Sequence, residues 1–253
     1  MSPAFPAEFS AFLSPAGRRR MARCAGALAD ADPPFLALAG ALDAAAVARG
    51  RAALEARMLP LLSRIDVPIP DWTIWNQTRS FQERLPKVAR LRTATLERRG
   101  TRAWRAAEEI GVVALLRSQS LRRFGEALTG RRLKPGAGCQ ILCYGPGDYM
   151  GPHHDHHPDI PGARDGYLDI HIGMSAPAVR RQTLLLARGG HLTETIELAR
   201  PSLIAAYRLP FWHQIGPLEP RRGADPATAL RWVLLASFRF ADGTRDPGPA
   251  FRA

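Results

Sequence analysis

Four of the seven histidines in this 253-residue chain lie within five consecutive positions, beside two aspartates, in the stretch YGPGDYMGPHHDHHPD. Imidazole and carboxylate groups are metal ligands, and side chains two positions apart on a β-strand point to the same face. Three pairs have that spacing: His153 with Asp155, His157 with Asp159, and Asp169 with His171. Two histidines and one carboxylate on one face of an octahedral metal leave positions open for a cosubstrate and oxygen. The pattern therefore predicts a metal site, but it leaves three candidate pairs and requires a third ligand from elsewhere.

The segment from Tyr144 to Asp155 resembles the Tyr-x-x-Gly…Pro-His-x-Asp segment of the iron(II)- and 2-oxoglutarate-dependent dioxygenases, especially their prolyl-4-hydroxylase-like branch. Tyr144 precedes His153 by nine residues, as in that branch, so the resemblance selects His153 and Asp155. The family's distal histidine lies at the end of a later strand, and His213, 58 residues after Asp155, fits this place. The resemblance thus implies that His153, Asp155 and His213 bind Fe(II) and form the catalytic centre.

The resemblance also implies a basic residue that binds the far carboxylate of the cosubstrate 2-oxoglutarate. Arg222 has the family's spacing from His213, but it lies in EPRRGADP, which favours a loop. Arg231 opens the apolar stretch RWVLLASF, which predicts a strand, so we expect RRGADPAT to be a loop insertion and Arg231 to be this residue. A guanidinium group can bind a carboxylate through two parallel hydrogen bonds. Tyr144 is similar to the family tyrosine whose hydroxyl helps to bind the cosubstrate.

Seven further polar residues near these candidates have open roles: His154, His156, His157, His171, Arg180, Arg181 and Gln182. We expect His154 to point away from the metal and the next two histidines to begin a loop that overhangs the site. His171 would line the pocket if the polar face of its strand turns inward. The run Arg180 to Gln182 favours a solvated turn over contact with substrate.

The elements that must position these residues change character along the chain. The first half reads as helical, with a helix predicted over 44–65 behind an N-cap at Asp43. A second helical block over 103–130 has Ser118 or Ser120 as an N-cap and Gly130 as its end. The stretch TIWNQTRSF predicts one short strand in this half. From Cys139 onward the pattern is of short strands: CQILCY, YLDIHIGM, QTLLLAR, HLTETIEL, SLIAAYRL and ALRWVLLASFRF.

This pattern predicts an α+β fold with a double-stranded β-helix core, of the jelly-roll, cupin-like type. We expect a single domain over 1–253. Within it, a mainly helical N-terminal region over 1–132 would pack on a catalytic core over 133–253.

Composition limits the setting in which the protein works. The formal net charge is +12, carried almost entirely by arginine, which indicates a compositional bias at least as much as a nucleic-acid-binding surface. Nucleic acid therefore remains a less favoured partner. The three cysteines form no CxxC pair and are odd in number, which indicates a reducing compartment. The sequence has no export signal and no apolar run of about 20 residues, so we expect a cytoplasmic protein without membrane association.

The resemblance implies an Fe(II)/2-oxoglutarate-dependent dioxygenase whose partners are 2-oxoglutarate, O2 and an unidentified substrate. Halogenating relatives replace the metal carboxylate with a small residue, so the presence of Asp155 favours hydroxylation. The prolyl-4-hydroxylase-like branch suggests an unactivated C–H bond of an amino acid, peptide or protein. Two alternatives stay open: a nucleic-acid demethylase of the same chemistry, and a non-catalytic jelly-roll module that binds a metal.

Overall fold

The computed structural model describes residues 3–31, 34–68, 88–153, 155, 166–188, 191–208 and 213–241. The strands of these residues are β1 Phe35–Ala39, β2 Ser63–Pro68, β3 Val88–Thr95, β4 Gly138–Tyr144, β5 Tyr149–His153, β6 Tyr167–Ser175, β7 Val179–Arg181, β8 Thr183–Arg188, β9 His191–Glu197, β10 Leu203–Arg208, β11 His213–Ile215, β12 Glu219–Pro220 and β13 Arg231–Arg239. The α-helices are α1 Phe9–Phe12, α2 Pro15–Ala22, α3 Ala44–Arg57, α4 Arg102–Glu109, α5 Val112–Leu116 and α6 Gln119–Thr129. Short 3-10 turns span Leu59–Leu61 and Pro226–Thr228.

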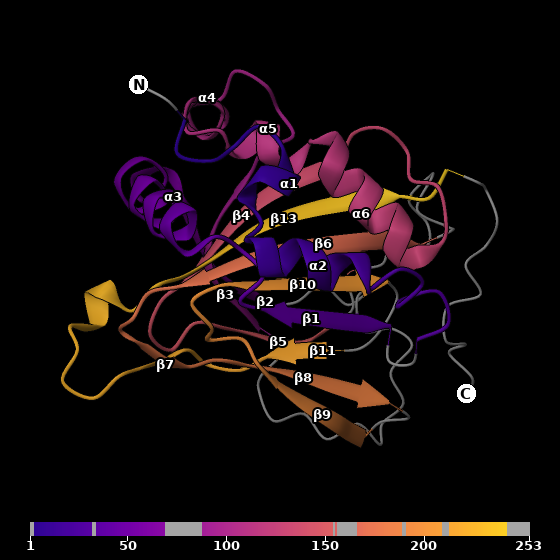
Figure 1. The fold of residues 1–253 in the computed structure, drawn as a ribbon. Helices are drawn as coiled ribbons and strands as arrows, with labels where there is room; N and C mark the ends of the chain where they lie inside the picture. Colours follow the sequence, from indigo (N-terminus) through magenta and orange to yellow (C-terminus); the bar gives the residue numbers. More distant parts are fainter. Residues whose placement is uncertain are drawn as a thin grey trace.

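Eleven of these strands form one curled antiparallel sheet. Its order is β1-β10-β6-β13-β4-β3-β5-β11-β8-β9, with β2 added at β3, and β12 and β7 form a separate pair. The long strand β3 pairs with β4 near one end and with β5 near the other, so it carries the sheet round its bend. In Figure 1 the strands β5, β11, β8 and β9 lie below the larger part of the sheet. This arrangement confirms the predicted jelly-roll core.

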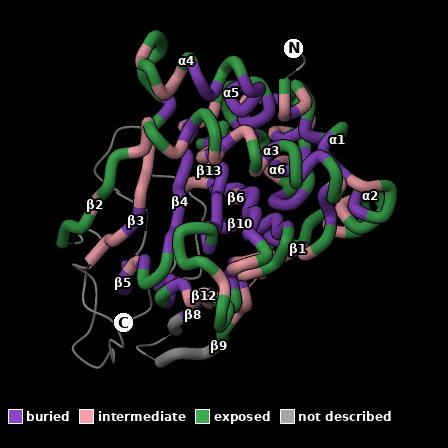
Figure 2. Tube along the Cα trace, turned by 90° about the vertical axis from the view of Figure 1, so that its left-hand side faces the viewer, coloured by how far each residue is buried: buried purple, intermediate pink, exposed green. Residues whose placement is uncertain are grey.

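The helices cover the outer face of the larger part of the sheet (Figure 1). The helices lie there because side chains alternate between the two faces of each strand, and those on the outer face are apolar. Outward residues such as Ile170, Ile172 and Trp232 are at most 1 % exposed and join one apolar cluster with residues of the helices. Inward residues such as Leu142 and Val233 belong to a second, smaller cluster between the two parts of the sheet. Figure 2 shows β4, β13 and β6 buried along most of their length. The candidate site residues share the inner face with this second cluster.

Three predicted helix boundaries are confirmed. The Asp43 carboxylate accepts a hydrogen bond from the backbone N–H of Ala46 at 2.8 Å, and Ser118 caps α6 by accepting one from Leu121. Gly130 ends α6 with a φ of 67°, a left-handed conformation that glycine adopts readily.

Two helical predictions are corrected. The helix that begins at Ala44 ends at Arg57 rather than continuing to residue 65, because Pro60 has no backbone N–H with which to extend it. The block from 103 to 118 contains two helices, since Gly111 lies between them with a φ of 91°.

The first half, predicted to be mainly helical with one short strand, also contributes three strands to the core. Strands β1, β2 and β3 come from residues 35–95 and belong to the same sheet as the later strands. Residues from both halves therefore build the barrel that surrounds the site. The strand predicted at TIWNQTRSF lies outside the described residues. Within the described chain, no helix combines the length and apolar character needed to span a membrane.

Candidate active site

The three predicted metal ligands lie together at the ends of two neighbouring strands. His153 is the last residue of β5 and His213 the first of β11, and the antiparallel register pairs them directly. Their ring centroids are 4.3 Å apart. Asp155 follows β5, with its Oδ1 3.4 Å from His153 Nε2 and its Oδ2 3.5 Å from His213 Nε2. Both histidines are 4 % exposed, while the Asp155 side chain is 40 % exposed. The triad therefore has a buried side and an open side.

Hydrogen bonding and charge prepare these groups for a cation. The Nδ1 of His153 lies 2.7 Å from the backbone carbonyl of Gly151, which can only accept, so Nδ1 donates, and Nε2, which faces Asp155, is the nitrogen that a metal ion would bind in place of a proton. Burial acts to lower the pKa of His153, but the charge of Asp155 and a hydrogen bond to it outweigh burial and raise it. Burial acts to raise the pKa of Asp155, but His153 and His213 lower it well below the ordinary range. Asp155 is thus held as a carboxylate.

The donor set fits iron(II). One ligand atom from each of the three residues lies within 4.8 Å of the other two. Metal–ligand bonds of about 2.0–2.2 Å at right angles would place neighbouring ligand atoms roughly 3 Å apart, so the observed triangle would contract around a bound ion. Two imidazoles and one carboxylate on one side of a metal are the ligand set of non-haem iron(II) oxygenases.

Arg231 lies deep in the barrel and holds a charge without a counter-ion. Its side chain is 2 % exposed, and its Nη1 donates to Oε1 of Gln182 at 3.1 Å. No described carboxylate makes an ion pair with it, and its Nε has no hydrogen-bond partner in the described chain. Burial lowers the pKa of Arg231, but a guanidinium group keeps its proton in proteins. Because buried charges in proteins are normally paired, this guanidinium marks a place for an anion.

Two hydroxyl groups beside Arg231 are also available to bind a ligand. The register places Tyr144 and Ser175 on either side of Arg231, and the Arg231 Cζ lies 5.5 Å from the centre of the Tyr144 ring. The hydroxyls of Tyr144 and Ser175 are buried and have no partner among the described residues. Gly173 leaves open the space beside the guanidinium, since a Cβ there would stand 3.6 Å from Nη2 of Arg231. These groups fit the carboxylate end of 2-oxoglutarate.

The alternative residues fall elsewhere. Arg222 lies exposed in a turn, outside the barrel. The candidate pair His157 and Asp159 lies outside the described residues, as do His154 and His156. The third candidate pair, Asp169 and His171, lines the same cavity as the triad. Neither residue belongs to the described group whose ligand atoms are close enough to hold one metal ion.

The cavity has a volume of about 860 Å³ and runs along the inner face of the sheet. Register arranges that face in rows across β4, β13 and β6, about 6.6 Å apart. From the inner end, the rows are Tyr144, Arg231 and Ser175; Leu142, Val233 and Gly173; Gln140, Leu235 and His171; Gly138, Ser237 and Asp169; then Arg239 and Tyr167. The Tyr207 ring lies 4.5 Å from the His171 ring and 5.7 Å from the His213 ring. The metal triad therefore faces the middle rows, with Arg231 and Tyr144 on one side and Asp169 and Arg239 on the other.

Gln182 is the site residue that sequence reasoning missed. The sequence predicts a solvated turn for Arg180, Arg181 and Gln182, yet Gln182 is 0 % exposed, whereas both arginines are exposed. Its amide nitrogen donates to the carbonyls of Asp148 and Gly216, which turns its oxygen toward Arg231. One signal was present, since Gln182 is the uncharged member of the polar run and precedes the apolar strand TLLLA.

Comparison with solved structures shows which class of fold surrounds this site. A 2OG-Fe(II) oxygenase family oxidoreductase from Burkholderia pseudomallei aligns over 89 % of this chain and 93 % of its own, with a TM-score of 0.53 and 15 % sequence identity. The non-heme alpha-ketoglutarate-dependent epimerase SnoN from nogalamycin biosynthesis aligns over 88 % of this chain and 82 % of its own, at a TM-score of 0.49 and 16 % identity. A Pseudomonas putida prolyl-4-hydroxylase aligns over 81 % of this chain and 91 % of its own, with a TM-score of 0.43 and 16 % sequence identity.

The first of these similarities shows that the chain has the fold of a 2OG-Fe(II) oxygenase. The family resemblance predicted from the Tyr144 to Asp155 segment is therefore confirmed at the level of fold. No protein-family model and no curated protein matches the sequence.

Proposed function

We propose that this protein is an Fe(II)/2-oxoglutarate-dependent dioxygenase that hydroxylates an unactivated C–H bond of an amino-acid, peptide or protein substrate. One observation carries the proposal: Arg231, buried without a carboxylate partner among the described residues, lies in the same barrel as a cluster of two histidines and one carboxylate. A metal-binding module would need the cluster but would have no use for the arginine. A reducing, cytoplasmic setting belongs to the same proposal.

Each group has a defined role in this proposal. His153, Asp155 and His213 hold iron(II) on one side, which leaves the other side free for ligands. Arg231 binds the far carboxylate of 2-oxoglutarate, assisted by the Tyr144 hydroxyl, and Gln182 keeps the guanidinium in place. When bound, iron and 2-oxoglutarate supply with O2 the oxidising power that no protein side chain has.

The protein's contribution is geometric and electrostatic. The charge on Asp155 offsets part of the metal's charge and leaves a site of lower net charge on the buried side. The apolar row of Leu142, Val233 and Gly173 separates the arginine from the metal, so it excludes water along the length of the cosubstrate. The substrate then approaches from the outer rows, on the other side of the triad.

The test compares Arg231→Ala with Arg222→Ala, a matched pair that removes one guanidinium from the barrel and one from the surface. Losing the partner of a buried carboxylate costs about 3–5 kcal/mol, or roughly a hundredfold or more in the 2-oxoglutarate requirement. We expect that rise for Arg231→Ala and no change for Arg222→Ala, measured as oxygen-dependent succinate formation. Equal effects of the two variants would refute the assignment. A wild type that retains iron but forms no succinate would instead support the non-catalytic module.

A further inference from the structure

The outer half of the cavity holds polar groups that the proposed chemistry leaves unused. Asp169 is 5 % exposed, and its Oδ1 has no hydrogen-bond partner among the described residues, although Ser237 bonds to the carboxyl group. The Nε2 of His171, two residues along the same strand, is likewise buried and unpartnered in the described chain. Both residues line the cavity. A buried acceptor without a partner is destabilising, so this position suits a ligand that donates hydrogen bonds or carries positive charge.

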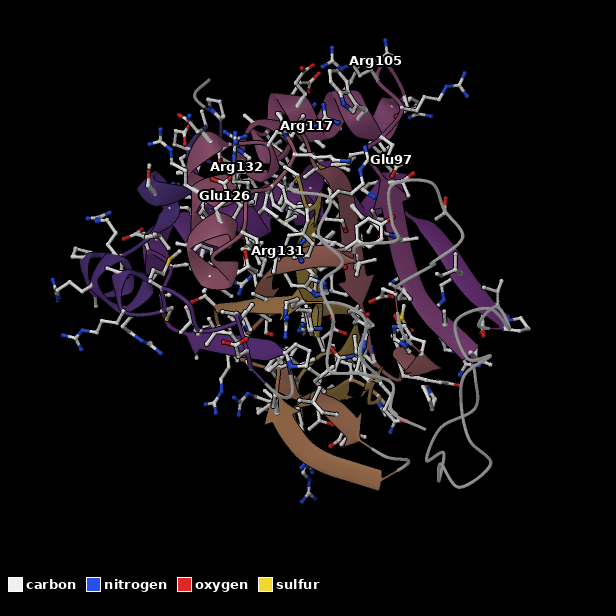
Figure 3. The ribbon with its side chains drawn as sticks, turned by 90° about the vertical axis from the view of Figure 1, so that its right-hand side faces the viewer. Glu97, Arg105, Arg117, Glu126, Arg131 and Arg132 are labelled. Atoms are coloured by element: carbon white, nitrogen blue, oxygen red, sulfur yellow. The ribbon has the colours of Figure 1, made fainter. Side chains whose placement is uncertain are left out.

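The rim of the same half is basic. Arg239 ends β13 in the row beyond Asp169, and Arg99 and Arg117 line the cavity from the loop after β3 and the end of α5. None of the three arginines makes an ion pair with a described residue. Besides Asp169, Glu97 is the one carboxylate among the described lining residues at this end, and Figure 3 labels it together with Arg117. The rim therefore suits an anion.

We propose that the outer half of the cavity binds a small zwitterion, whose ammonium group contacts Asp169 and whose carboxylate contacts Arg239, with Arg117 beside it. Free α-amino acids have this chemistry. Arg239 lies two residues, or about 6.6 Å, beyond Ser237, the register partner of Asp169, and its long side chain can reach back over that distance. The inference rests on the proposed function in one respect: a molecule bound here is the substrate only if the triad holds iron.

Charge and size both favour this occupant. Burial raises the pKa of Asp169 to about 8, helped by the charge of Asp155, so the carboxyl group near neutral pH is an uncompensated acid that an ammonium group would ionise. A cavity of about 860 Å³ lies within the range of small-molecule sites, and in the proposed function 2-oxoglutarate takes its part beside Tyr144 and the triad.

The test measures binding to the protein without metal or 2-oxoglutarate, so its result does not depend on turnover. The twenty common L-amino acids are screened by ligand-observed NMR, and each amino acid that binds is compared with its α-hydroxy acid and its methyl ester. We expect at least one to bind, and the ester, which lacks the carboxylate, to bind at least tenfold more weakly. Asp169→Asn should weaken binding of the amino acid about 10- to 100-fold and leave binding of the hydroxy acid unchanged, because only the ammonium group needs the charge of the carboxylate. Arg239→Gln should weaken binding of the amino acid and of the hydroxy acid by a similar factor, because both carry the carboxylate.

The control is Arg105→Gln, since Arg105 is exposed on α4, outside the cavity lining, at the outer edge of the molecule in Figure 3. It should change neither affinity. Failure of all twenty amino acids to bind, equal losses for both acids in Asp169→Asn, or tighter binding of inorganic phosphate than of any amino acid would overturn the inference. Amino-acid binding by a protein that forms no iron(II)–2-oxoglutarate complex would overturn the proposed function alone.

Discussion

Replacing Gln182 should weaken 2-oxoglutarate binding although this residue touches neither metal nor cosubstrate in the proposal. Its amide makes three hydrogen bonds, at 3.1, 3.2 and 3.3 Å, and the side chain is 0 % exposed. Gln182→Leu keeps the volume but removes all three bonds, each worth about 0.5–1.5 kcal/mol, so we expect a loss of about 3 kcal/mol in the free energy of unfolding. For a chain of this size, that loss corresponds to a fall of about 6–12 °C in Tm.

The companion variant Gln182→Glu tests the role of Arg231 by charge. It would place a carboxylate where Oε1 now lies 3.1 Å from the arginine's Nη1, giving the guanidinium an internal counter-ion. An anion that competes in this way should lower 2-oxoglutarate affinity about a hundredfold or more, while iron affinity stays within twofold of wild type.

The assay is an anaerobic titration of the iron-loaded protein with 2-oxoglutarate. Arg181→Gln is the matched control, since this neighbouring side chain is exposed and its nitrogen lies 3.9 Å from Glu197, a surface pair worth about 0–1 kcal/mol. Unchanged 2-oxoglutarate affinity in Gln182→Glu would refute the reasoning, because a paired Arg231 could not then be the cosubstrate's partner.

Three further predictions follow from other positions. Gly173→Val would fill the space beside Arg231, so the titration should show at least tenfold weaker 2-oxoglutarate binding with iron binding retained; unimpaired binding would show that the cosubstrate lies elsewhere. The folded pKa of Asp169 is raised from 3.8 to about 8, so between these values the folded state keeps a proton that the unfolded state releases, and the free energy of unfolding falls as pH rises. Metal-free Asp169→Asn should therefore gain stability relative to wild type between pH 5 and pH 8 in thermal melts, and a constant difference would contradict this. Burial raises the pKa of Cys143 to about 12, so under native conditions a thiol reagent should label the half-buried Cys24 and leave Cys143 unmodified, as checked by mass spectrometry of peptides.

Local patterns were sufficient to predict most strands of the second half and three candidate pairs of metal ligands. Strand alternation, the spacing of Tyr144 before His153 and the apolar stretch after Arg231 are properties of short segments, and the structure has strands at these places. The meeting of His153 with His213 needed more than spacing, since it depends on the pairing of β5 with β11. Here the family resemblance supplied the long-range information.

Most of the mistaken predictions concern features that depend on residues distant in the sequence. The strand β3 carries arginines at alternate positions, and its basic character hid a pattern that becomes a strand by pairing with β4 and β5. Gln182 is buried because residues 148 and 216 supply its acceptors, which no local pattern could indicate. For Asp169 and His171, alternation placed both on one face without saying that the face lines the cavity. The end of α3 could have been predicted from the sequence, because Pro60 is a local signal that ends a helix.

The visible charge-transfer band that forms when iron(II) and 2-oxoglutarate are added anaerobically tests the metal site and the cosubstrate assignment together. If His153, Asp155 and His213 hold the metal and the cosubstrate chelates it, the wild-type protein should develop a weak band that saturates at one iron per chain. His213→Ala should develop none. Absence of the band in the wild type, or its persistence in His213→Ala, would contradict the account.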